Sequence, residues 1–163
     1  DYQKQRLASF LDPSADPLGA GYQLQQSQIT VGSGGLFGRG LTNSLAGQNL
    51  PVGSTDFVFA HVSEQLGFLG GSVVLALFAL LIWRVLNVGW RSGDTFTLAF
   101  SGGIAGMLLF QMIVNVGMVL GVMPITGLPL PFVTYGGASL LSAALGLGIL
   151  ESLAMSRSGS GQV

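Results

Sequence analysis

Three long apolar stretches dominate the second half of the chain. They cover about residues 62–86, 96–122 and 132–155, and polar positions are isolated within each of them. At about 1.5 Å of rise per helical residue, each stretch is long enough to cross the ~30 Å apolar layer of a bilayer. The pattern therefore predicts three transmembrane helices within residues 62–157 and the fold class of an all-α, polytopic membrane helix bundle.

Residues 1–61 have a different pattern, because they are rich in glycine and hold most of the charged side chains. No apolar window in this region reaches the length of about 20 residues that a spanning helix needs. We predict an extramembrane loop region with a short helix over 22–30 and a tightly turning segment over 32–40 (GSGGLFGRG). The tail SGSGQV (158–163) is typical of a flexible end or an artificial linker, and the start at Asp1 suggests a piece of a longer polypeptide.

Composition agrees with the membrane assignment and excludes several kinds of site. Hydrophobic residues make up 49% of the chain and charged residues 8%, whereas soluble domains carry roughly a quarter charged residues. The absence of Cys and the single His exclude disulfides, thiolate chemistry and a multi-His zinc site. The net charge of −1 and the lack of a basic run predict that nucleic acid is not a partner.

The placement of arginines predicts the orientation in the membrane. Arg84 and Arg91 flank the link between the first two stretches, and Arg157 follows the third, whereas the link over 123–131 has no Lys or Arg. The positive-inside rule places these three arginines in the cytoplasm. The 1–61 region and the 123–131 link then lie outside, and Asp56 lies at the outer boundary of the membrane.

Asp56 is the leading candidate for chemistry. It stands in the stretch GSTDFVF (53–59), just ahead of an apolar run. Ser, Thr and Asp before a helix are typical of an N-cap. A carboxylate at the mouth of a membrane cavity can also act as a general base or bind a metal ion. Both interpretations stay open from the residues alone.

Other polar residues near the membrane have two interpretations each. Glu64 either reaches back to water from the interface or contacts a substrate. The glycine segment is either a plain flexible loop or a cradle whose backbone N–H groups bind phosphate, with Arg39 neutralising a pyrophosphate. Gln111 and Asn115, spaced i, i+4 within the second stretch, either bond to a neighbouring helix or line a polar cavity.

Three stretches, together with a lead-in over residues 16–23, resemble the SEDS family (shape, elongation, division and sporulation), the RodA- and FtsW-type peptidoglycan polymerases. They are GYQLQQSQITVGSGGLFGRGL (21–41), LPVGSTDFVFAHVSEQLGFLG (50–70) and NVGMVLGVMPITGLPLPFVTYGGASLL (115–141). The match favours the RodA type. Where the family commonly has Glu and His in LPE-x-HTDF, this chain has Val52 and Ser54, which puts any role of those two side chains in doubt.

The resemblance implies a bundle of about ten transmembrane helices, of which this chain supplies the large extracytoplasmic loop and the last three. It implies an enzyme of the bacterial cytoplasmic (inner) membrane that polymerises lipid II, with the growing strand held on undecaprenyl pyrophosphate. It also implies a class B penicillin-binding protein as partner. The essential Asp of the family's TDF motif maps onto Asp56.

We therefore expect a glycosyltransferase site on the outer face. Asp56 is its general base or, in a variant of the same hypothesis, the ligand of a divalent cation such as Mg or Mn. The alternatives are a transporter (flippase) for a lipid-linked precursor and a non-catalytic scaffold for the penicillin-binding protein. The expected substrate-binding residues are Ser33, Gly34, Gly35, Arg39, Thr55 and Glu64.

Overall fold

The computed structural model of the chain describes residues 20–40 and 57–158, and the regular structure in these ranges is helical. Its helices are α2 (Ala20–Ser33), α4 (Val58–Arg91), α5 (Thr95–Val119) and α6 (Gly137–Ser158). Three of them, α4, α5 and α6, are long and apolar enough to cross a membrane. The predicted class, an all-α polytopic membrane protein, is confirmed, and α2 confirms the short helix that the 22–30 segment predicts.

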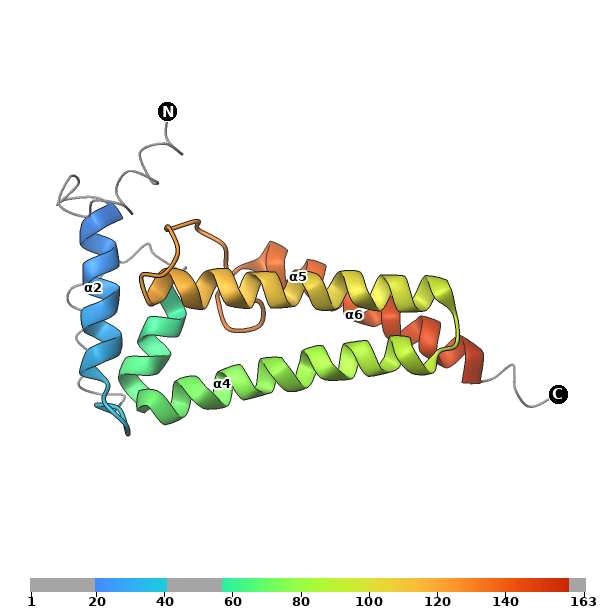
Figure 1. Ribbon diagram of the computed structural model, residues 1–163, viewed down its shortest axis with the longest axis horizontal. Coiled ribbons are helices and arrows are strands. Elements are labelled where there is room, and N and C mark those ends of the chain that lie inside the picture. Colours follow the sequence, from blue (N-terminus) through green and yellow to red (C-terminus); the bar gives the residue numbers. More distant parts are fainter. Residues whose placement is uncertain (1–19, 41–56, 159–163) are drawn as a thin grey trace, which may run out of the picture.

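A break at Gly67 divides α4 into two segments. Gly67 has φ 70° and ψ −167°, which no helix contains. The first segment, residues 58–66, turns away from the axis of the long segment over 68–91 (Figure 1). The long segment ends at Arg91, and Asp94 then starts α5 as its N-cap, its carboxylate accepting a hydrogen bond from the Thr97 N–H at 3.1 Å.

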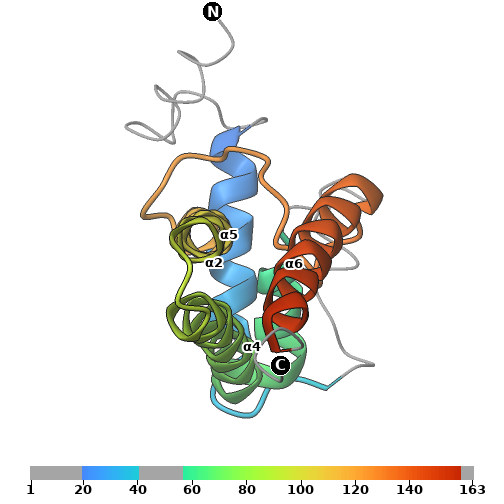
Figure 2. The same ribbon diagram turned by 90° about the vertical axis from the view of Figure 1, so that its right-hand side faces the viewer.

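The long segment of α4 lies beside α5 in the opposite direction, and α6 packs against both of them. Helix α2 lies across the end of this bundle where α4 begins and α5 ends (Figures 1 and 2). We call this the α2 end. At that end Gln28 Nε2 of α2 donates a hydrogen bond of 3.3 Å to the Leu120 carbonyl, just past the last turn of α5. Such bonds satisfy the carbonyls that a helix terminus leaves without intrahelical partners.

Two buried clusters stabilise the fold, one toward each end of the bundle. The cluster at the α2 end joins α2, the first segment of α4, the end of α5 and the link that follows it. The second joins the long segment of α4 to α5 and α6. Much of the remaining apolar surface of the three long helices is exposed, as expected for helices that meet lipid or further helices. The first cluster consists of Leu24, Phe57, Phe59, Ala60, Met118, Val119 and Ile125.

Candidate functional site

The most unusual feature of the α2 end is the way the break in α4 is closed. We call residues 34–40, which follow α2, the glycine loop. Without the break, the N–H groups of Phe68 and Leu69 would bond to the carbonyls of Glu64 and Gln65. The glycine loop replaces both bonds, since its backbone supplies the missing partners on each side of the break.

Four backbone hydrogen bonds join the glycine loop to α4. The N–H groups of Arg39 and Gly40 donate to the carbonyls of Glu64 and Gln65, at 3.0 and 3.2 Å. In the other direction, Phe68 N–H donates to Gly35 O at 2.9 Å, and Leu69 N–H donates to Leu36 O at 3.3 Å. The broken helix therefore keeps its backbone satisfied beside a membrane, where an unpaired group costs several kcal/mol.

Two glycines of this junction, Gly38 and Gly67, are required both by the lack of space and by their backbone conformation. A Cβ on Gly38 would collide with the backbone of Gln65 and Gly67, and a Cβ on Gly67 would collide with the backbone of Leu36 and Gly38. Both glycines also have positive φ, +79° and +70°, which side chains rarely adopt. The two chain segments can approach this closely only because both side chains are missing.

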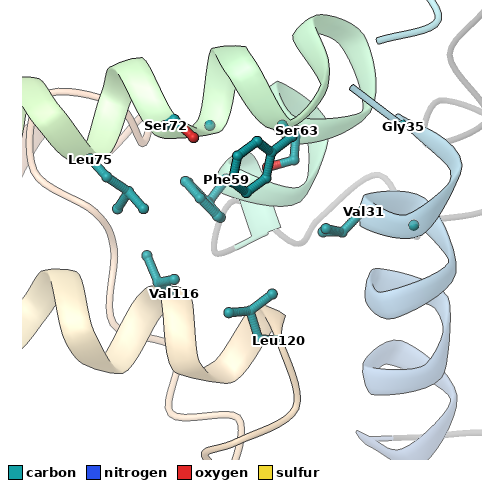
Figure 3. A pocket seen from close by; sticks show the side chains of 11 residues that line it. Val31, Gly35, Phe59, Ser63, Ser72, Leu75, Val116 and Leu120 are labelled. Atoms are coloured by element: carbon teal, nitrogen blue, oxygen red, sulfur yellow. The ribbon is translucent and has the colours of Figure 1, made fainter. Parts of the chain in front are cut away.

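A cavity lies in the crook of the bent α4, next to this junction (Figure 3). Its volume is about 330 Å³, and α2, both segments of α4 and the end of α5 surround it. Its walls are mostly apolar, with the hydroxyls of Ser63 and Ser72 as the polar exceptions. The side chains and backbone seen around it in Figure 3 belong to Val31, Gly35, Phe59, Ser63, Ser72, Leu75, Val116 and Leu120.

Five of the predicted substrate-binding residues, Ser33, Gly34, Gly35, Arg39 and Glu64, come together at the junction. Besides its backbone bond to Glu64, Arg39 donates from Nε to the Ser33 carbonyl at 3.1 Å, which caps the end of α2. Gly34 packs directly on the backbone of Ser63 and Glu64, and its N–H already donates to Val31 O at 3.2 Å. Gly35, the remaining predicted residue of the loop, lines the cavity.

The interpretation of Glu64 as an interfacial side chain that reaches water is wrong. Its exposed fraction is 0%. The bend at Gly67 turns the first segment of α4 back toward α2, and the glycine loop covers the turn that carries Glu64. A substrate contact by its side chain stays a prediction.

Asp56 and Thr55 lie outside the described residues, so their predicted roles stay predictions. The residue after Asp56 is well defined, because Phe57 is 1% exposed and belongs to the cluster at the α2 end. Phe57 is also the N-cap position of α4, and no side-chain hydrogen bond caps the helix there. Asp56 therefore stands one residue ahead of the N-cap.

The predicted cation site rests on Asp56 and is likewise untested. Within residues 20–40 and 57–158, no group of three or more His, Cys, Asp or Glu side chains could hold a metal ion. A cation at this end would need Asp56 itself or ligands from outside these ranges.

Sequence reasoning missed the structural role of Gly67 and the bond that Asn115 makes to the link after α5. Gly67 is one of 26 glycines in the sequence. Its role as the break in α4 is recognised only from its contact with the glycine loop. Asn115 Nδ2 donates to the Leu128 carbonyl at 2.9 Å, a bond that ties the link after α5 back against that helix. The Pro-rich composition of the link was the only local signal that it folds back.

Comparison with known proteins gives consistent matches over almost the whole chain. A family model for FtsW, RodA and SpoVE, described as "Cell cycle protein", matches residues 1–159. The peptidoglycan glycosyltransferase MrdB of Escherichia coli (strain K12) is 46% identical over 155 residues, which are 94% of this chain and 42% of that protein. The peptidoglycan glycosyltransferase RodA of Treponema pallidum is 44% identical over 154 residues, 93% of this chain and 36% of that protein. The chain thus spans less than half the length of these curated relatives.

Two solved structures are similar in fold as well as in sequence. A chain of a peptidoglycan synthase complex, studied for the coordination of polymerization and crosslinking, has a TM-score of 0.78 and 38% identity over 96% of this chain and 42% of that chain. A variant of the rod shape determining protein RodA of Thermus thermophilus has a TM-score of 0.63 and 38% identity, covering 82% of this chain and 40% of that one.

Proposed function

The chain belongs to the FtsW, RodA and SpoVE family, and we propose that it is part of a membrane glycosyltransferase that polymerises lipid II into peptidoglycan strands. Relatives from two bacterial species are named peptidoglycan glycosyltransferases. The observation that carries the proposal is the junction at the α2 end, where the glycine loop gathers Arg39, Gly35 and Glu64 beside an apolar cavity. The TDF sequence containing Asp56 precedes the first segment of α4, which ends at this junction.

In the proposed orientation the α2 end faces the outside of the cytoplasmic membrane. Arg84 and Arg91 are exposed near the opposite end of α4, and Trp83 and Trp90 are exposed beside them. Arginines mark the cytoplasmic side, and tryptophans prefer the membrane–water interface. These four side chains support a cytoplasmic location for the end away from α2.

The proposed reaction forms a glycosidic bond at the sugar next to the pyrophosphate of the growing strand. Asp56 takes the proton from an acceptor hydroxyl of lipid II, and that oxygen attacks the anomeric carbon of the donor sugar. The bond from this carbon to the pyrophosphate oxygen breaks, and undecaprenyl pyrophosphate leaves with the electron pair. Arg39, which is exposed at the α2 end, stabilises the leaving charge. In the metal-ligand variant, Asp56 would hold a divalent cation, which would supply positive charge to the same pyrophosphate.

The cavity supports a lipid-linked substrate. It lies where a spanning helix bends at the α2 end, so an apolar chain in it stays at the level of the lipid while the attached phosphates reach the aqueous side. Ligand cavities of a few hundred Å³ with mostly apolar walls are typical of such sites. We propose that the cavity, of about 330 Å³, takes part of an isoprenoid chain.

A class B penicillin-binding protein is the proposed partner. The solved chain with the higher TM-score belongs to a complex in which polymerization and crosslinking are coordinated. Crosslinking requires a transpeptidase. A polymerase whose glycan strand becomes the substrate of a bound transpeptidase is consistent with such a complex.

A transporter for a lipid-linked precursor is the second candidate, because transporters often contain broken helices and α4 is broken. In transporters, however, the backbone groups freed at a break point toward the transported solute near the bilayer midplane. Here the break lies at the α2 end, and the glycine loop binds the freed groups of Glu64, Gln65, Phe68 and Leu69. Glycosyl transfer is therefore favoured.

An assay with the full-length protein in lipid vesicles distinguishes the two candidate functions. The vesicles are loaded with fluorescent lipid II on both leaflets. We expect glycan polymer on a gel and no faster exchange of lipid II between the leaflets than in protein-free vesicles. Accelerated exchange without polymer would support the transporter instead. A protein that does neither but still binds the transpeptidase would be a scaffold.

A further inference from the structure

We infer that the glycine loop acts as a backbone splint, by which we mean that its four hydrogen bonds to α4 fix the angle between the two segments of that helix. Gly38 and Gly67 are then positioning residues for the chain segment that carries Asp56. The inference rests on the proposed function. It assigns the loop a role different from the phosphate cradle that its composition suggests.

The loop's own N–H groups are the first reason. A cradle needs N–H groups that point at a ligand. The N–H groups of Gly34 and Gly38 donate to carbonyls within α2 and the loop, and those of Arg39 and Gly40 donate to α4. These four groups hold the protein together and do not face a substrate.

The second reason is the way the first segment of α4 is held. At one end, Phe57 and Phe59 are buried against α2 and α5 in the cluster at the α2 end. At the other end, the splint fixes the carbonyls of Glu64 and Gln65. Residues 58–66 are thus anchored at both ends, and in the sequence only Phe57 separates Asp56 from this anchored segment.

The third reason is that a small distortion of this backbone junction should lower the reaction rate strongly. The splint tolerates no side chain at Gly38 or Gly67, because a Cβ would collide with backbone and not with a movable side chain. Its distortion would change the tilt of residues 58–66 and move the carboxylate ahead of them. A displacement of about 1 Å of a reacting group can lower a rate about 100-fold.

The test compares Gly38→Ala with Gly102→Ala in the full-length protein with its transpeptidase partner. Gly102 is exposed on α5, and a methyl group added there would have no neighbour within 4 Å among the described residues, so its change serves as the control. For Gly38→Ala we expect kcat for lipid II polymerisation to fall about 10- to 100-fold. KM should stay within about threefold, because a positioning residue does not contact the substrate. Gly102→Ala should leave both constants unchanged.

The outcomes distinguish failure of the splint inference from failure of the proposed function. A wild-type kcat for Gly38→Ala overturns the splint inference, and a raised KM with unchanged kcat would indicate the substrate cradle instead. If wild-type protein makes no polymer, the proposed function fails first. If wild type is active and Asp56→Asn is inactive while Gly38→Ala is normal, only the splint inference fails.

A second measurement covers the case in which Gly38→Ala does not fold. Amide hydrogen exchange of the wild-type protein reports the splint directly, because Phe68 and Leu69 lack helical acceptors and depend on Gly35 and Leu36. We expect these amides to exchange as slowly as those inside the long segment of α4. Exchange at the rate of unbonded backbone would overturn the inference without any substitution.

Discussion

Replacing Asn115 with leucine should weaken the fold in a way that replacing Gln111 does not. The two residues lie about one turn apart on α5, so they share a face of that helix. Asn115 is 0% exposed, and its Nδ2 donates to the Leu128 carbonyl at 2.9 Å. Gln111 Oε1 is also buried but has no hydrogen-bond partner among the described residues. The pair therefore separates the effect of a hydrogen bond from that of polarity alone.

The expected loss for Asn115→Leu is about 1–2 kcal/mol of unfolding free energy. Hydrogen bonds between side chains in membrane proteins average about 0.6 kcal/mol and reach about 1.7. A buried acceptor left without a donor costs about 1–3 kcal/mol. We expect a loss in the upper part of the range for membrane proteins, because the Leu128 carbonyl lies in a non-helical link. It therefore has no intrahelical N–H donor that could replace Asn115. For Gln111→Leu we expect no loss or a small gain, because a buried polar atom is removed.

The assay is SDS titration of the full-length protein in mixed micelles, with helicity followed by circular dichroism. Amide exchange over residues 123–131 gives a local readout, since only Asn115→Leu should speed exchange in the link. Equal losses for the two variants would refute the reasoning, as would an unchanged unfolding free energy for Asn115→Leu.

Three further substitutions test the packing and the helix ends by the same titration. Gly89→Leu should cost about 1–3 kcal/mol, because its side chain would collide with Ser101 across the α4–α5 contact; an unchanged midpoint would contradict that close contact. Asp94→Ala should cost about 0.5–2 kcal/mol by removing the N-cap bond to Thr97, and Asp94→Ser should restore most of it. Gln28→Ala should cost only about 0.5 kcal/mol, since its bond to the end of α5 is exposed. It should nevertheless speed amide exchange in α2, and unchanged exchange would argue against this bond as an anchor.

The three spanning helices and α2 could be predicted because their signals are local. Apolar runs of sufficient length report membrane helices wherever they occur, and a helical pattern needs no distant partner. The observed ends of the spanning helices differ from the predicted ends by several residues, because features other than hydropathy set them. Asp94 sets the start of α5 through a side-chain bond, and Gly121, with φ +77°, follows its last turn.

The bend in α4 could not be predicted, because it depends on a contact between segments distant in sequence. A glycine inside an apolar run is common in membrane helices and does not by itself break them. Gly67 becomes a break only because the glycine loop supplies the lost backbone bonds. The burial of Glu64 has the same origin, since the bend turns its segment back toward α2 and the glycine loop covers the turn that carries it.

The candidate site was predicted in part. The sequence pointed to Ser33, Gly34, Gly35, Arg39 and Glu64 as substrate-binding residues; the structure places these five at one junction, and their contact with a substrate remains a prediction. Their contacts there are largely backbone contacts, which residue types do not reveal. Asp56 was selected by its motif, and its chemistry remains a prediction for experiment.

The most direct test of the central claim is lipid II polymerisation by the full-length protein with its transpeptidase partner, comparing wild type with Asp56→Asn. Asparagine keeps the size of the side chain and its ability to accept hydrogen bonds from backbone, but it cannot take a proton. Size-exclusion profiles in detergent establish that both proteins are equally folded. We predict that wild type yields glycan strands and that Asp56→Asn yields none. Undiminished product from a folded Asp56→Asn protein would contradict the account and return Asp56 to a structural role at the start of α4.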